Sequence, residues 1–572
     1  MKNLRPLVLA AVVMAAGLLA FGLWTRPNAE PSDAEGFSAA RAVEDIKVIS
    51  REHHSVAHPE ERARVREYLV GRLEQLGADT VSLYKYDSLT GPENKHVTYT
   101  FDAVDVLAEF SPLKESEDAT YLLFIAHYDS RYSQPMPKDT VWSYGAADDG
   151  YGISVTLETV SQLLKSRAQW NQGVKVLFTD AEEVGMMGMK AIWENDREVF
   201  DNVGFIINLE ARGPWGPALL FETCPGNSNV MDLYAKTAGY PFTYSLTTVV
   251  YGFMPNFTDF KVVKDSIPGM NFSTIADINH YHTDLDNFDN ISTRSIQHYG
   301  AQVLPVALEY LTNPVYADKN SLKADEDTVN FTLPVLGLFN FSKGMYKVVN
   351  VAVYVIFLLL LAFAGIRGRI KAAKVFRNSV VVLGIAVGVL ALGEAFAWVC
   401  STIAGAQFKL FGVIPGVSFD NAAMAVFVAL MTVVSVLAYV SGRKKAMMAV
   451  SGSMRANAPV NAAIRYADNT LYGGLSLMLV LSAALLFAIG ENLMFLIPLA
   501  FVSAGLMLYR LTSLKLWLVL SAGLVLLHAF SFLHALAMAL TIGAFGAVAM
   551  LAFIDIMVLI PLADLYLTTT KK

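Results

Sequence analysis

Long uncharged stretches in the second half of the chain constrain its fold more than any other feature. From about residue 346 onward apolar runs dominate, whereas residues from about 35 to 330 have the mixed composition of a globular domain. Of the 572 residues, 54% are hydrophobic and only 17% are charged, which is too apolar for an ordinary soluble protein. Part of the chain is therefore expected to lie in lipid, and the change in composition marks the main domain boundary.

The apolar runs are long enough to cross a bilayer as helices. Pro6 to Trp24 is an uncharged run of about 18 to 20 residues, which suffices for the roughly 30 Å hydrocarbon core. A cleaved signal peptide is the alternative, but no small-x-small cleavage site follows directly, so we expect an uncleaved anchor. Seven further candidate spans lie near residues 347–366, 379–400, 420–441, 471–489, 493–509, 515–534 and 537–566.

The distribution of lysine and arginine predicts the orientation of these spans. With the N-terminus inside, a large set of basic residues beside the spans falls on the cytoplasmic side. They are Arg367, Arg369, Lys371, Arg443, Lys444, Lys445, Arg455, Arg465, Arg510, Lys515, Lys571 and Lys572. We therefore expect both termini in the cytoplasm and the globular domain in the periplasm, a lumen or the exterior.

Two acidic residues, Glu394 and Asp555, fall inside predicted spans. Ionisable groups are costly in lipid, so each is a candidate for a functional role. An interhelical hydrogen bond or a position near the interface is the simpler interpretation. The expected domains are an anchor and linker (1–34), a globular domain (35–315), a linker (316–345) and a membrane domain with about seven helices (346–572).

The globular part alternates between strand and helix patterns. Residues 59–77 place apolar side chains at helical spacing and stop at Gly77, which predicts an amphipathic helix with a glycine cap. Short apolar runs then alternate with helical patterns; the runs are 121–126, 174–179 and 203–209, and the helical patterns begin near 150 and 184. This order predicts an α/β domain with a mostly parallel mixed sheet, helices on both faces and right-handed crossovers.

Metal-ligand side chains follow each predicted strand. They are His127 and Asp129 after the first run, Glu182 and Glu183 after the second, Glu210 after the third, with Asp148 and Asp149 between glycines and His282 in a later loop. The carboxyl ends of parallel strands meet at one edge of a sheet, where ligands bind. Imidazole and carboxylate ligands without thiolate suit a catalytic zinc centre.

Each of these motifs has a simpler interpretation when taken alone. A single His-x-Asp is more often a surface hydrogen bond, and adjacent glutamates usually mark the first turn of a helix. Asp148 and Asp149 are equally typical of a turn before a helix N-terminus. Their joint occurrence at one edge of one sheet is hard to obtain by chance, and it favours metal catalysis.

The order of these motifs resembles a known family. The segments His127-x-Asp129, GAADDG, AEEVG, NLEARG and HTDLD are similar to those of the co-catalytic zinc aminopeptidases of metallopeptidase family twenty-eight. The resemblance covers roughly residues 40–312. With the segment MPNFTDFKVVKDSIPGMNF (254–272) and the multi-span second half, the chain most resembles the vacuolar and endoplasmic-reticulum membrane proteases of that family.

The resemblance implies a role for each residue of the site. Asp148 would bridge two zinc ions, with Glu183 and His282 completing one site and His127 and Glu210 the other. Glu182 would be the general base that takes a proton from the water between the metals, which two ions would acidify. Asp129 would orient His127, and Tyr251 would stabilise the oxyanion.

The chain departs from the family pattern at two positions. Gly150-Tyr151 stands where many relatives carry Ala-Ser, and we expect the tyrosine to narrow the substrate cleft. Glu210 stands where the soluble bacterial enzymes have aspartate, so its longer reach is expected to shift the second zinc site.

The leading hypothesis is a membrane-bound zinc aminopeptidase acting on peptides outside the cytoplasm, because the resemblance implies action on a free amino terminus. The alternatives are a catalytically inactive binding module of a membrane complex and a one-zinc glutaminyl cyclase-like enzyme. The resemblance implies that such cyclases lack a working first histidine, which His127 supplies. The net charge of -7 argues against nucleic acid. The expected partners are a peptide substrate and the lipid bilayer; a homo-oligomer through the membrane domain stays open.

Overall fold

The computed structural model describes residues 5–24, 27–94, 97–113, 119–131, 134–135, 140–252, 257–414, 416–451 and 458–568. The chain divides into two compact units. The α/β unit comprises Thr25–Thr332 and Leu336–Lys343, and the helical unit comprises Met1–Trp24, Leu333–Val335 and Gly344–Lys572. Residues 254–256 of the family-like segment and three of the basic residues used above, Arg455, Lys571 and Lys572, lie outside the described residues.

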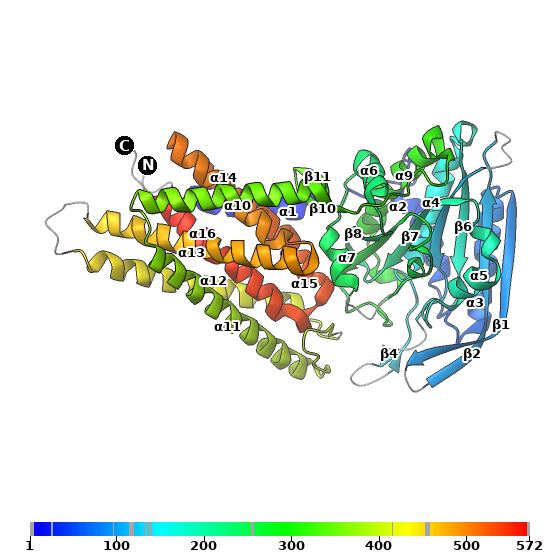
Figure 1. Cartoon of the computed structure of the whole chain (residues 1–572). Helices are drawn as coiled ribbons and strands as arrows, with labels where there is room; N and C mark the ends of the chain where they lie inside the picture. Colours follow the sequence, from blue (N-terminus) through cyan, green and yellow to red (C-terminus); the bar gives the residue numbers. More distant parts are fainter. Residues whose placement is uncertain are drawn as a thin grey trace. The chain divides into compact units, whose positions relative to one another are not determined.

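A seven-stranded mixed sheet forms the centre of the α/β unit (Figure 1). Its strand order is β1-β2-β6-β3-β7-β9-β8. The strands are β1 (Thr80–Asn94), β2 (Val97–Phe110), β3 (Tyr121–His127), β6 (Gly173–Thr179), β7 (Val203–Ala211), β8 (Trp215–Thr223) and β9 (Gly269–Ala276). The four central strands β6, β3, β7 and β9 are parallel, and the strands on both edges pair antiparallel. The predicted fold class is confirmed, with antiparallel pairing confined to the edges.

The central strands are buried along their whole length. Every residue of β3, β6 and β7 is buried, which requires cover on both faces of the sheet and explains why they are continuous apolar runs. The helices of this unit are α2 (Ala39–Ile49), α3 (Pro59–Gln75), α4 (Gly150–Leu164), α5 (Met187–Asn195), α6 (Ser228–Thr237), α7 (Ser245–Gly252), α8 (Phe260–Val263) and α9 (Thr293–Thr312). The helix predicted at 59–77 is α3, and Gly77 follows it with a φ of 85°, the left-handed conformation that favours glycine.

The segment 316–345, predicted to be a linker, is folded. It contains the paired strands β10 (Thr328–Leu333) and β11 (Gly337–Ser342). Every residue of β10 is buried, and its sequence TVNFTL alternates polar and apolar residues, which is the period of a strand. The prediction of a linker was wrong because the run is too short to stand out beside the membrane spans. A further short pair, β4 (Gln134–Pro135) and β5 (Thr140–Val141), precedes the GAADDG loop.

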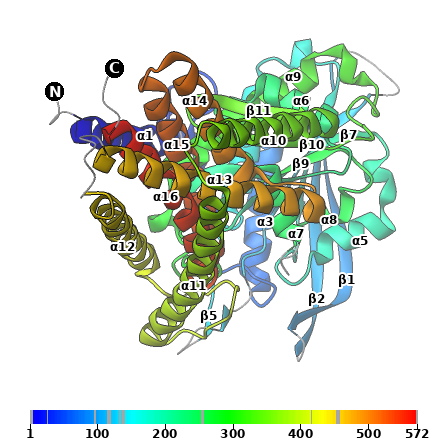
Figure 2. The ribbon, with the colours of Figure 1, turned by 60° about the vertical axis from the view of Figure 1, so that its left-hand side comes forward.

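The helical unit consists of long apolar helices (Figure 2). Eight helices in the described part of the chain are long and apolar enough to cross a membrane. They are α1 (Arg5–Trp24), α10 (Lys343–Ile366), α11 (Ala372–Ala404), α12 (Asp420–Met448), α13 (Ala458–Ile489), α14 (Leu493–Thr512), α15 (Leu516–Leu540) and α16 (Phe545–Thr568). Each overlaps one of the runs singled out in the sequence, and the chain is a membrane protein.

Candidate metal centre

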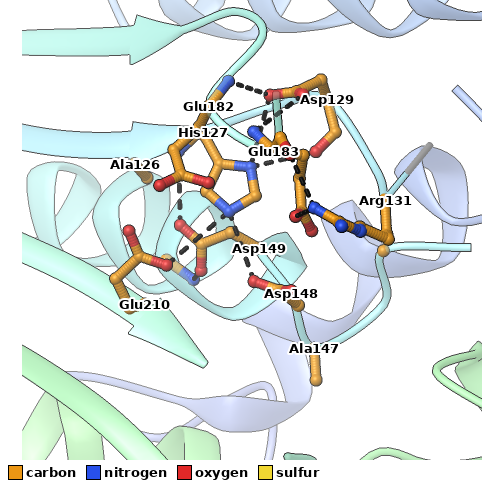
Figure 3. A network of polar contacts seen from close by, with 12 residues as sticks. Ala126, His127, Asp129, Arg131, Ala147, Asp148, Asp149, Glu182, Glu183 and Glu210 are labelled. Atoms are coloured by element: carbon orange, nitrogen blue, oxygen red, sulfur yellow. Dashed lines mark hydrogen bonds and ion pairs between the residues drawn. The ribbon is translucent and has the colours of Figure 1, made fainter. Parts of the chain in front are cut away.

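Three neighbouring parallel strands bring their polar ends to one edge of the sheet. His127 is the last residue of β3, Glu182 and Glu183 follow β6 after a short turn, and Glu210 is the penultimate residue of β7. Because β6 and β7 flank β3 on either side, these side chains converge around the ring of His127 (Figure 3).

A first group of ligand atoms forms around His127. Its Nε2 atom lies 3.3 Å from Asp148 Oδ1 and 3.6 Å from Glu210 Oε2. The ligand atoms of these three buried residues all lie within 4.8 Å of one another, which is close enough for one ion to reach all three.

A second group shares Asp148 with the first. Its other carboxylate oxygen, Oδ2, lies 3.3 Å from His282 Nε2, and that same nitrogen lies 3.2 Å from Glu183 Oε2. One oxygen of Asp148 thus faces each histidine. The structure therefore brings together the five residues predicted to be metal ligands, as two triads joined by one carboxylate.

Asp129 contacts His127 through its main chain and the Glu182-Glu183 segment through its carboxylate. Its backbone carbonyl oxygen lies 2.9 Å from His127 Nδ1, so an Nδ1–H donor leaves Nε2 free to face the site. Its carboxylate lies 3.5 Å from Nδ1 and instead accepts the backbone N–H groups of Glu182 (2.9 Å) and Glu183 (3.2 Å). The residue predicted to orient His127 thus contacts the histidine mainly through its main chain.

The loop that carries Asp148 is fixed at several points. Gly145 begins it with a φ of 65°, where a β-carbon would lie 3.0 Å from the carbonyl oxygen of Asp148, so glycine is required. Asp149 caps α4 by accepting the N–H of Gly152 at 2.8 Å. Of the two adjacent aspartates, Asp149 serves the helix and Asp148 faces the histidines.

Two polar residues near the site were missed by sequence reasoning. Arg131 donates to the carbonyl oxygen of Glu183 at 2.6 Å and to its carboxylate at 3.2 Å. Asp286 accepts the N–H of Ala147 at 2.7 Å and that of Asp148 at 3.3 Å. The signal for Asp286 was its place within the HTDLD motif, and the signal for Arg131 was a cation four residues after the first histidine.

Tyr251 lies near the end of α7 and has a free hydroxyl. Its Oη is buried and has no hydrogen-bond partner among the described residues. Burial, with the charges of Glu222, Glu210 and Glu182, raises the pKa of Tyr251 above its usual range. The tyrosine therefore keeps its proton.

Tyr151 does not narrow a cleft, and that prediction was wrong. The residue is completely buried in α4. Its hydroxyl donates to the carbonyl oxygen of Pro214 at 2.8 Å and accepts the N–H of Ser292 at 2.6 Å. The departure from the family pattern thus serves packing, because a large side chain at the second position of this helix points into the core.

Several carboxylates lie close together in the site and change one another's pKa values. Burial and neighbouring carboxylates raise the pKa of Glu210 and hold that of Glu182 well above its usual range. Burial acts the same way on Glu183, but His282 and Arg131 outweigh it and lower the pKa of Glu183. Burial alone would lower the pKa of His127, yet the surrounding carboxylates raise it well above the usual value.

The donor set fits zinc. Nitrogen and carboxylate oxygen atoms without thiolate are typical of catalytic zinc sites. Within the described residues, the buried Oε1 of Glu183 accepts no hydrogen bond, which leaves an anionic oxygen available. Carboxylates held this close repel one another, and a shared cation would offset that repulsion.

Comparison with known proteins agrees with these observations. Residues 105–307 match the model of Peptidase family M28. The chain is 28% identical over 327 residues to human endoplasmic reticulum metallopeptidase 1, covering 53% of this chain and 34% of that protein. It is 25% identical over 342 residues to a vacuolar membrane protease of Schizosaccharomyces pombe, covering 56% of this chain and 36% of that protein. It thus spans only about a third of the length of these relatives.

Among solved structures, the chain is similar to a glutaminyl cyclase from Bacteroides thetaiotaomicron. The identity is 20% and the TM-score is 0.38, over 48% of this chain and 98% of that chain. All five clustered residues lie within the family match to residues 105–307. The chain therefore carries a metallopeptidase domain of family M28.

Proposed function

We propose that the α/β unit is a two-zinc aminopeptidase that removes residues from the free amino terminus of peptides outside the cytoplasm. The observation that carries this proposal is the position of Asp148, whose two oxygens lie 3.3 Å from two different histidines. His127 and Glu210 would complete one zinc site, and Glu183 and His282 the other. Such a pair of ions supplies Lewis acidity toward the scissile carbonyl and lowers the pKa of water.

Glu182 is the proposed general base. It is half-buried, lies beside His127 in Figure 3, and belongs to neither triad of ligand atoms. A carboxylate that does not bind metal is free to take a proton from water and pass it to the leaving amine. Its backbone N–H is held by the Asp129 carboxylate at 2.9 Å, which fixes the start of its side chain.

Tyr251 is the proposed oxyanion donor. Its hydroxyl has no partner in the described part of the protein and retains its proton because burial raises its pKa. A donor that is already desolvated and unpaired can bind a developing negative charge without first breaking another hydrogen bond.

The site is proposed to face away from the cytoplasm. The basic residues that flank the long helices in the described chain include Arg367, Lys371 and Arg443, and the positive-inside rule places these on the cytoplasmic side. In the described part of the chain, one helix long and apolar enough to cross a membrane, α1, precedes the α/β unit. Accessibility of a cysteine introduced at an exposed residue of α5 to a membrane-impermeant reagent in intact cells tests this orientation.

The exchange Glu182→Gln tests the mechanism. Removing a general base is expected to lower kcat by about 10²-fold to 10⁴-fold, while zinc content stays at two per chain because no ligand is lost. Glu194→Gln, which changes an exposed glutamate of α5, is the matched control and is expected to keep wild-type activity. Unchanged hydrolysis in Glu182→Gln would remove this mechanism.

The assay and the metal content separate the competing functions. Hydrolysis of aminoacyl fluorogenic peptides is expected with free amino termini and not with blocked ones. Activity on blocked peptides alone would overturn the exopeptidase assignment, and one zinc per chain with no hydrolysis would favour a cyclase-like enzyme. Two zinc ions with no activity on any peptide would favour a binding module.

A further inference from the structure

An apolar groove runs between three helices of the helical unit. It has a volume of about 610 Å³ and is lined by residues of α10, α11 and α13. Of its lining residues, only Ser379 and Ser476 carry a polar side chain. Ser379 donates to the carbonyl oxygen of Gly473 at 2.8 Å, whereas the buried Oγ of Ser476 has no hydrogen-bond partner among the described residues. The rest of the wall is hydrocarbon or aromatic.

One end of this groove is strongly basic. Its lining residues Gly365, Ile370 and Ala372 alternate with cationic residues of the turn between α10 and α11. These cations are Arg367, Arg369 and Lys371 in the turn, followed by Lys374 and Arg377 in the first turns of α11. The backbone N–H of Lys371 donates to Asn469 Oδ1 at 2.9 Å, which fixes the start of α11 against α13.

These cations have few internal partners. No described carboxylate lies within 4.0 Å of the charged atoms of Lys371, Lys374 or Arg377, all of which are exposed. Arg367 packs its guanidinium over the ring of Phe363 at 5.2 Å. Asp468, an acid of α13, is paired with Arg510 at 2.8 Å. The cluster thus carries uncompensated positive charge at the point where an apolar groove reaches the end of the helices.

We propose that this groove binds one anionic phospholipid, with an acyl chain between α10, α11 and α13 and the headgroup phosphate on the basic cluster. An apolar groove between helices long enough to cross a membrane suits an acyl chain, and lysine and arginine at one end of it suit a negative headgroup. Both chemistries meet in a phospholipid of the bilayer and not in a soluble peptide. The site is separate from the proposed zinc centre, so its test uses lipid binding rather than hydrolysis.

The experiment is native mass spectrometry of the delipidated full-length chain in detergent. The two probes are dioleoyl phosphatidylglycerol and dioleoyl phosphatidylcholine. One phosphatidylglycerol is expected to remain bound at concentrations where phosphatidylcholine does not. Lys371→Gln/Lys374→Gln is expected to weaken phosphatidylglycerol binding about 25-fold, since each cation near an anionic lipid contributes about fivefold. The matched control, Lys444→Gln/Lys445→Gln, removes the same charge from exposed positions at the end of α12 and is expected to bind normally.

A second pair of variants tests the groove itself. Gly365 lines the groove, and a β-carbon there would meet no atom within 4 Å. Gly365→Trp therefore starts from open space, and we expect its ring to occupy the groove and weaken binding at least about tenfold, the contact of two methylene groups. Gly388 of α11 is equally open and does not line the groove, so Gly388→Trp is expected to bind normally. Equal binding of the two lipids, or equal effects of each variant and its control, would overturn the proposal. The proposal would also be overturned if the unaltered chain formed dimers and Gly365→Trp dissociated them. The groove would then be an interface between copies of the chain.

Discussion

The buried acidic groups of the two units differ in how they are paired. In the α/β unit, carboxylates crowd around two histidines, and Asp148 alone lies within 3.3 Å of both. In the helical unit, two of the buried acids each have a partner of their own. Asp468 pairs with Arg510 at 2.8 Å, and Glu394 accepts the N–H of Gly546 at 3.1 Å, which is the interhelical hydrogen bond that its place in a span suggested.

The number of partners that a buried carboxylate shares with its neighbours has an energetic consequence. A one-to-one contact gives each acid a partner that no second carboxylate shares. A cluster in which negative charges outnumber their partners is unfavourable by itself, and it becomes favourable only when a cation joins it. Burial is common to both regions, so the number of carboxylates that share one histidine is the feature that distinguishes them and supports the proposed metal site.

Asp148→Asn is expected to have the largest effect. Asparagine keeps the shape of the side chain but removes the charge that faces both histidines. If the two triads hold zinc, the variant loses metal and several kcal/mol of transition-state stabilisation, so kcat/KM for peptide hydrolysis falls by about 10⁴-fold or more. Elemental analysis of purified protein measures the zinc content. Two ions per chain with normal activity would contradict the proposed role of the Asp148 charge.

The stability of the same variant gives an independent result. Without zinc, Asp148→Asn relieves part of the carboxylate repulsion, so its thermal midpoint is expected to exceed that of zinc-free wild type. With zinc bound, the order reverses, because the wild type gains binding free energy that the variant lacks. A variant that is less stable than the wild type in both states would show that Asp148 serves packing.

The cluster of five side chains could be predicted because each member has a local signal. His127, Glu183 and Glu210 lie at or directly after strands whose uninterrupted apolar runs are readable from sequence, since the central strands are buried on both faces. Parallel pairing then places their ends together. His282 and Asp148 lie in loops, where their residue types made them candidates and the resemblance to a family implied their roles.

The supporting contacts could not be predicted in the same way. Asp286 meets the loop of Ala147 across 139 positions of sequence, and no periodicity reports such a contact. Tyr151 was placed in the cleft because its neighbours are site residues, but the first turn of α4 directs it into the core. The hairpin at β10 and β11 was missed because a strand pattern of six residues is weak beside long apolar helices.

Asp468→Leu tests the other side of the comparison. It leaves the Arg510 guanidinium largely buried without its partner, which is expected to cost about 3 kcal/mol of unfolding free energy. Denaturation in detergent measures this loss, while zinc content and peptide hydrolysis stay normal. The double variant Asp468→Leu/Arg510→Met is expected to recover most of the stability, because the unpaired charge is gone. Lost activity at unchanged stability would instead give this pair a functional role.

Two tyrosine exchanges compare a free hydroxyl with a satisfied one. Tyr251→Phe removes a buried hydroxyl that has no partner among the described residues of the α/β unit. The exchange is expected to lower kcat by about 10²-fold, the effect of one oxyanion donor, with little change in stability. Tyr354→Phe removes a hydroxyl that lies 2.9 Å from both Ser482 Oγ and Asn492 Nδ2 in the helical unit. It is expected to cost about 1 kcal/mol of stability and no activity. A stability loss in Tyr251→Phe without a change in kcat would remove its proposed role.

The smallest effect is expected from Asp286→Asn, which tests how far the crowded site depends on the residues around it. Oδ2 of Asp286 accepts the Ser143 hydroxyl at 3.0 Å and the N–H of Asp148 at 3.3 Å, and an amide NH₂ in its place cannot accept either. Asp148 is then held less firmly, and zinc affinity is expected to fall by about 10-fold to 100-fold, measured by competition with a fluorescent chelator. Asp284→Asn changes an exposed aspartate of the same motif and is expected to bind zinc normally. Equal affinities in the two variants would mean that the hydrogen bonds of Asp286 do not contribute to zinc binding. The clustered residues would then need no support from their surroundings, like the one-to-one contacts of the helical unit.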